Sequence, residues 1–168
     1  APRVLNRVLN RAPGSLLAEA ALKLILARFS APQPAGVPPR LAGRIPVVLV
    51  VGDSSGGLEA NYHGTTVLTQ VMRGMWPDLR DGLEKEGLLV VRPVPHNDLG
   101  ALEAAFREHD QPPHKVAAFF YEPVLMNFGA RRLGEAFVRR VHELCEASDA
   151  PTVVDEIQTG VWGKELFF

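Results

Sequence analysis

Cysteine, aromatic residues and net charge are all scarce in this chain of 168 residues. The single cysteine, Cys145, excludes an internal disulfide and predicts a packed core thiol in a reducing compartment. A formal net charge of −1 gives no electrostatic reason to expect nucleic acid or an acidic membrane as partner. No apolar run approaches the roughly 20 residues that span a bilayer. Residues 1–7 carry positive charge, but no apolar segment of a secretory signal follows them. We therefore expect a cytoplasmic protein without a membrane partner.

Short apolar runs alternate with segments of helical spacing along the chain. A continuous apolar run such as residues 45–51 is typical of a strand that is covered on both faces. Prolines between residues 30 and 43 predict a loop. Strands are predicted at 45–51, 87–94, 116–121 and 151–154, and helices at 15–29, 64–75, 99–109 and 133–147. The alternation predicts an α/β fold, a three-layer αβα sandwich around a mainly parallel sheet.

Carboxylates and an amide follow directly after the last predicted strand, in the sequence Asp-Glu-Ile-Gln-Thr-Gly at 155–160. Open α/β sheets present charge to a ligand at the carboxyl ends of buried strands, and Asp155 has that place. Asp155 and Gln158 could instead only cap the next turn. The adjacent Glu156 argues against that alternative, because two neighbouring acids after a buried strand are costly unless something uses them.

The same run resembles the Asp-Glu-(Val/Ile)-Gln-Thr-Gly signature of class III aminotransferases, which are pyridoxal-phosphate enzymes of fold type I. The resemblance implies that Asp155 pairs with the pyridinium nitrogen of pyridoxal 5'-phosphate (PLP) and keeps the ring able to accept electrons. It further implies that Ile157 packs behind that ring and that Gln158 contacts its phenolic oxygen.

Three earlier segments resemble the family in the same order. Gly14 and Ser15 open a segment similar to Ser-Gly-Ala-Glu-Ala-Asn-Glu-Ala-Ala-Leu-Lys, which implies that their backbone N–H groups bind the cofactor phosphate. Tyr62 and His63 lie in a run similar to Tyr-His-Gly-(Arg/Lys)-Thr, which implies that the tyrosine stacks on the cofactor with the histidine close by. Glu122 ends a strand in the family's Glu-Pro-(Val/Ile) pattern, beside the strand of the aspartate, and is implied to join the network around the cofactor.

The resemblance covers residues 14–160 and implies part of a PLP-binding large domain. That part comprises a helix with a phosphate-binding start at 13–29, a proline-rich loop at 30–44 and an α/β core at 45–168. The family's Schiff-base lysine lies well beyond the aspartate run, and Lys164 is too close to be that residue. We therefore expect no catalytic residue within the chain, which alone would be inactive. The implied reaction moves an amino group from an amino donor to a keto acid or aldehyde, in a homodimer.

Two alternatives remain open at this stage. Gly-Asp-Ser-Ser-Gly at 52–56 follows a predicted strand, as the nucleophile elbow of an α/β-hydrolase does, with Ser54 as the nucleophile. That hypothesis leaves the Asp155 run unexplained, and we prefer to interpret the segment as a flexible connection that leads to Tyr62. The other alternative is a non-catalytic interaction module that keeps the sheet but lacks the lysine.

Overall fold

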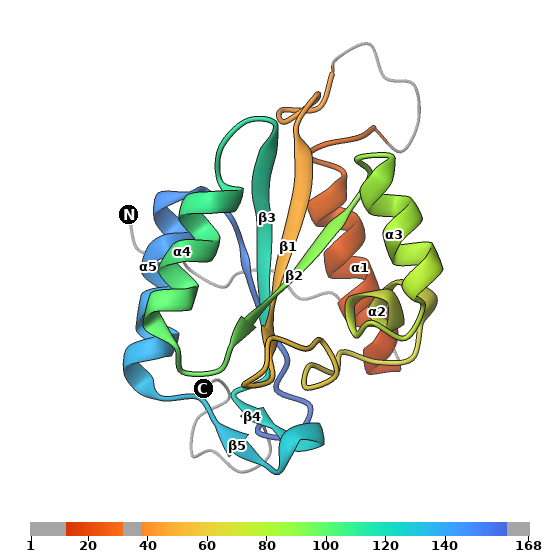
Figure 1. The fold of residues 1–168 in the computed structure, drawn as a ribbon. Helices are drawn as coiled ribbons and strands as arrows, with labels where there is room; N and C mark the ends of the chain where they lie inside the picture. The colour runs from red at the N-terminus through yellow and green to blue at the C-terminus, as the bar shows by residue number, and fades with distance from the viewer. Residues whose placement is uncertain (1–12, 32–37, 161–168) are drawn as a thin grey trace.

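A parallel four-stranded sheet lies between two layers of helices in the computed structural model, which describes residues 13–31 and 38–160 (Figure 1). The strands have the order β2-β1-β3-β6 and are parallel throughout. Their bounds are β1 (Ile45–Gly52), β2 (Val90–Pro95), β3 (His114–Tyr121) and β6 (Thr152–Val154). Helices α1 (Gly14–Leu26), α2 (Val67–Met72) and α3 (Pro77–Lys85) cover one face, and α4 (Leu99–His109) and α5 (Glu135–Ala147) the other. The predicted three-layer α/β fold is confirmed.

Each face of the sheet carries its own hydrophobic core, since side chains alternate along β1. Val47 and Leu49 join the core under α4 and α5, and Val48 joins the core under α1. Burial on both faces explains why β1 is apolar at successive positions. Cys145 lies in the first core with 2% of its surface exposed, as the sequence predicted, and burial raises the pKa of its thiol to about 12.

The structure differs from the sequence prediction mainly around short, exposed elements. Helix α1 ends at Leu26, and α2 occupies only the middle of the predicted segment 64–75. Helix α3 was missed because it is short and none of its residues is fully buried, although Leu83 packs partly buried against the core under α1. A small antiparallel hairpin was missed as well. It consists of β4 (Val124–Leu125) and β5 (Arg131–Arg132), joined by the 3₁₀ helix η1 (Met126–Phe128).

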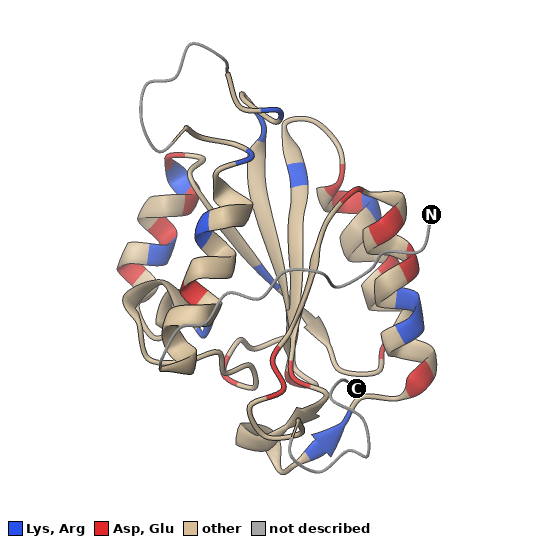
Figure 2. Ribbon diagram, turned by 180° about the vertical axis from the view of Figure 1, so that it is seen from behind, with Lys and Arg blue, Asp and Glu red and all other residues tan. Residues whose placement is uncertain are grey.

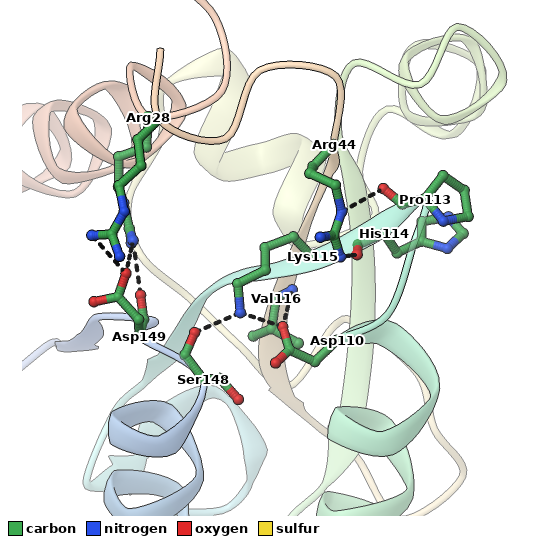
Figure 3. A network of polar contacts seen from close by, with 10 residues as sticks. Arg28, Arg44, Asp110, Pro113, His114, Lys115, Val116, Ser148 and Asp149 are labelled. Carbon is green, nitrogen blue, oxygen red and sulfur yellow. Dashed lines mark hydrogen bonds and ion pairs between the residues drawn. The ribbon is translucent and has the colours of Figure 1, made fainter.

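A polar network fixes the amino end of the sheet, opposite the end that carries Asp155 (Figure 3). Lys115, at the start of β3, pairs with Asp110 and donates to the backbone oxygen of Ser148 at 2.5 Å. Arg28, just after α1, donates to the Asp149 carboxylate at 2.6 Å. The Lys115 contacts tie the ends of α4 and α5 to β3, and the Arg28 contact ties the end of α1 to the turn after α5.

Charged residues lie mostly on the helices, with further acidic residues at the carboxyl end of the sheet (Figure 2). Among the helices in residues 13–31 and 38–160, none combines the length and the hydropathy needed to cross a bilayer. Lys164 and the other residues of 161–168 lie outside the described part of the chain.

Candidate active site

Two acidic residues meet at the carboxyl end of the sheet because they follow neighbouring parallel strands. Glu122 comes directly after β3 and Asp155 directly after β6, and Tyr121 pairs with Val154 in the ladder between them. The ladder continues one step further, where the Asp155 N–H donates to the backbone oxygen of Tyr121 at 2.9 Å. The predicted juxtaposition of the glutamate with the aspartate strand is therefore present in the structure.

The Asp155 carboxylate is held by a buried histidine. Nδ1 of His63 lies 3.1 Å from Oδ2 of Asp155, and the side chains are 1% and 21% exposed respectively. Because a carboxylate only accepts hydrogen bonds, the proton of this contact belongs to Nδ1. The imidazole packs on Phe120 of β3, with the ring centroids 5.5 Å apart. Its Nε2 is buried and has no hydrogen-bond partner within residues 13–31 and 38–160.

Glu122 lies deeper than Asp155, with 2% of its surface exposed. Burial, and then the negative charge of Asp155, raise the pKa of Glu122 to about 8. The backbone N–H of Tyr62 donates to Oε1 of Glu122 at 3.2 Å, which opposes that rise. At neutral pH Glu122 is therefore mostly protonated.

The start of α1 reaches this site through a close contact with the loop after β1. Pro13, the residue before α1, is extended, and no acid lies in the first turn of the helix. The hydroxyl oxygen of Ser15 accepts a hydrogen bond from the N–H of Thr65 at 3.1 Å. Gly64 has a φ of +114°, and a Cβ there would lie 2.7 Å from the Ser15 Cα. Glycine thus permits the close approach that brings the helix N-terminus beside Tyr62.

These contacts enclose a cavity of about 220 Å³ at the carboxyl end of the sheet. Its lining residues are Gly14, Ser15, Tyr62, His63, Gly64, Asp155 and Ile157. A neighbouring cavity of about 250 Å³ shares Gly14, His63, Asp155 and Ile157 with it. Ile157 is 63% exposed and offers an apolar surface at its edge.

The structure thus brings together six of the residues singled out in the sequence, which come from three segments far apart in the chain. Two others stand apart from the cavity lining. Glu122 is buried and reaches the site through the backbone of Tyr62. Gln158 is exposed and, in the described part of the chain, lines neither of the two cavities.

Sequence reasoning missed one side chain at the site, Arg73. Its guanidinium carbon lies 5.2 Å from the centroid of the Tyr62 ring, and its Nε donates to the backbone oxygen of Glu59 at 3.3 Å. Arg73 follows α2, and nothing in the local pattern distinguishes it from a solvated arginine at a helix end. The one available signal was its position shortly after the Tyr62 motif, at the end of the next helix.

The hydrolase alternative is wrong on the geometry of the turn after β1. The Asp53 carboxylate accepts hydrogen bonds from the backbone N–H groups of Ser55 and Gly57, each at 2.8 Å, so the turn is organised around the aspartate. Ser54 is exposed and its φ is not positive, unlike the strained serine of a nucleophile elbow. His63, the nearest histidine in sequence, is already engaged by Asp155.

The described lysines lie away from the cavity. Lys23 pairs with Glu19 on α1 at 3.0 Å, Lys85 ends α3, and Lys115 lies at the opposite end of the sheet. Among residues 13–31 and 38–160 no group of three or more His, Cys, Asp or Glu side chains could hold a metal ion. The chemistry available here is that of one carboxylate, a histidine, a protonated glutamic acid and a helix N-terminus.

Known proteins are similar in sequence to this chain over part of its length. The chain is 34% identical over 115 residues to the acetylornithine aminotransferase of Thermosynechococcus vestitus, a match that spans 64% of this chain and 27% of that protein. It is 32% identical over 120 residues to the glutamate-1-semialdehyde 2,1-aminomutase of Methanoculleus marisnigri, across 66% of this chain and 28% of the relative. The chain thus spans little more than a quarter of the length of these relatives.

Solved structures agree with the sequence comparison. The ornithine aminotransferase of Toxoplasma gondii superimposes with a TM-score of 0.59 at 27% identity, over 93% of this chain and 32% of that one. The family model for class III aminotransferases matches residues 6–164, which include both the strand-end acids and the start of α1. This chain therefore belongs to the class III aminotransferase family.

Proposed function

We propose that the complete protein is a PLP-dependent aminotransferase that moves an amino group from a small amino donor to a keto acid or aldehyde. Residues 1–168 would form part of its PLP-binding large domain. The observation that carries the proposal is the cavity itself, where Asp155, Tyr62 and the start of α1 line one space of about 220 Å³. Membership in the class III aminotransferase family implies PLP as the cofactor.

The residues of the cavity fit PLP at each of its chemically distinct parts. Gly14 and Ser15 begin a helix without acids in its first turn, where free N–H groups and the helix dipole favour a phosphate. Asp155 offers a carboxylate to the ring nitrogen, while Tyr62 and Ile157 provide flat and apolar surfaces for the faces of the ring. We also retain a contact between Gln158 and the phenolic oxygen as part of the proposal.

When bound, PLP supplies an electron sink for the carbon that carries the amino group. In the proposed site, the chain holds a proton on the ring nitrogen through Asp155 and thereby keeps the ring cationic. His63 fixes the orientation of that carboxylate through its Nδ1–H. Glu122 is mostly protonated at neutral pH, so it places no second negative charge beside the ring nitrogen that Asp155 is proposed to bind.

The proposal extends to assembly and location. By resemblance to the family we propose a homodimer with the site near the subunit boundary, acting on small soluble metabolites in the cytoplasm. The balanced charge of −1 is compatible with small-molecule substrates and supplies no electrostatic reason for a polyanionic partner.

The test is an amino-transfer assay on the complete protein loaded with PLP. A panel of α-amino acids and terminal amines is offered with a keto acid, and the new amino acid is measured by chromatography. Transfer from at least one donor class, dependent on added PLP, is the expected result. Binding of PLP without transfer from any donor would favour the non-catalytic module, and failure to bind PLP at all would contradict the proposal.

A further inference from the structure

Arg73 is fixed between a backbone oxygen and an aromatic ring. Its backbone N–H donates to the backbone oxygen of Thr69 in α2 at 3.2 Å, so Arg73 caps the end of that helix. From there its Nε reaches the Glu59 oxygen at 3.3 Å and its guanidinium carbon lies over the Tyr62 ring at 5.2 Å. Two contacts thus fix the guanidinium, the hydrogen bond to Glu59 and the Tyr62 ring.

Tyr62 and Arg73 line two different cavities. Tyr62 lines the cavity of about 220 Å³ proposed for the cofactor, whereas Arg73 lines a larger cleft of about 510 Å³ next to α3 and β2. Arg73 does not line the smaller cavity, yet its guanidinium carbon lies 5.2 Å from the centroid of the Tyr62 ring that does. A cation over a tyrosine face is attracted by the negative charge of that face.

The charge of Arg73 also acts on Glu122. It lowers the pKa of Glu122, against the larger effects of burial and of the Asp155 charge. Tyr62 is meanwhile tied to Glu122 through its own backbone N–H. Arg73, Tyr62 and Glu122 therefore form a connected set in which the guanidinium touches the ring from outside the cavity.

We propose that Arg73 is a positioning residue that holds the Tyr62 ring in place for stacking on the cofactor. This inference rests on the proposed function and adds a residue that makes no contact with the cavity itself. The role depends on a positive charge over the ring. A lysine at position 73 should therefore keep part of the function, whereas a neutral side chain of similar length should not.

The experiment measures the dissociation constant of PLP for the complete protein in its cofactor-free form, by fluorescence quenching, together with the circular dichroism of the bound cofactor. Arg73→Met should weaken binding by about two- to five-fold, the size of one cation–π contact, and change the dichroic band. Arg73→Lys should recover part of both signals. Arg80→Met is the matched control, because Arg80 lines the same cleft but pairs with Asp81.

A double-mutant cycle separates positioning of the ring from general support of the loop at Glu59. In a Tyr62→Leu background, Arg73→Met should no longer change PLP affinity, whereas in a Tyr62→Phe background it should still do so. An unchanged dissociation constant for Arg73→Met, or an equal loss with and without the ring, would overturn the inference while leaving the proposed function intact. No PLP binding by the wild-type protein would overturn both.

Discussion

His63 and Asp155 are 92 positions apart in the chain, yet Nδ1 of one lies 3.1 Å from Oδ2 of the other. The contact joins the loop after β1 to the end of β6, two strands that are separated in the sheet by β3. Phe120 of β3 fills the space beneath the imidazole, so the orientation of the histidine depends on the core. The carboxylate proposed to bind the cofactor is therefore fixed by the fold as a whole.

Replacing Glu122 with glutamine should change how stability depends on pH. The folded-state pKa of about 8 lies above the ordinary 4.5, so the protonated form stabilises the fold fully below pH 4.5 and its contribution is lost as pH rises through 8. The unfolding free energy of the wild type should thus fall by a few kcal/mol relative to Glu122→Gln between these two pH values. Urea denaturation at several pH values measures the difference. Parallel pH curves for the two proteins would contradict it.

Replacing Gly64 with alanine should damage both the fold and the proposed site. A side chain at φ +114° is strained, and its Cβ would lie 2.7 Å from the Ser15 backbone, which pushes the start of α1 away. We expect a loss of about 2 kcal/mol or more in stability, with weaker PLP binding in the complete protein. Gly82→Ala is the control, because a Cβ there meets no atom within 4 Å and alanine favours the interior of α3. Equal effects of the two changes would argue against the close approach.

The core contact of α1 can be separated from its exposed face by two leucines on that helix. Leu22 is fully buried and Leu24 is 62% exposed. Leu22→Ala should cost about 2–5 kcal/mol of unfolding free energy, whereas Leu24→Ala should cost close to nothing because alanine is a strong helix former. Chemical denaturation of both variants provides the measurement. A similar loss from both would mean that α1 does not pack on the sheet as described.

The sequence predicted the long buried elements better than the exposed ones. The segment 45–51 was recognised because burial on both faces makes it continuously apolar, and β1 occupies that place. Helix α3 is only 9 residues long and has no fully buried residue, so its periodic pattern is short and was overlooked. Its signals were instead those of its ends, Pro77 in the first turn and Lys85 in the last.

The site was predicted only as far as local motifs reach. Tyr62, His63 and Asp155 were named from short patterns at strand ends, and the structure gathers them around one cavity. The hydrogen bond between His63 and Asp155 depends on sheet order, which no single motif specifies. Arg73 was missed for the same reason, since its contact with Tyr62 arises from how α2 turns back over the loop.

The most direct test of the account is the turnover of the complete enzyme with Asp155 replaced by alanine. Asp155 is proposed to hold the proton on the ring nitrogen, so its loss should lower turnover by about a hundred-fold or more. The cofactor-free protein should still fold, with a melting temperature lowered by about a few degrees, because Asp155→Ala leaves Nδ1 of the buried His63 without its hydrogen-bond partner. Turnover near the wild-type level, in a protein that folds normally and binds PLP, would contradict the assignment of this site.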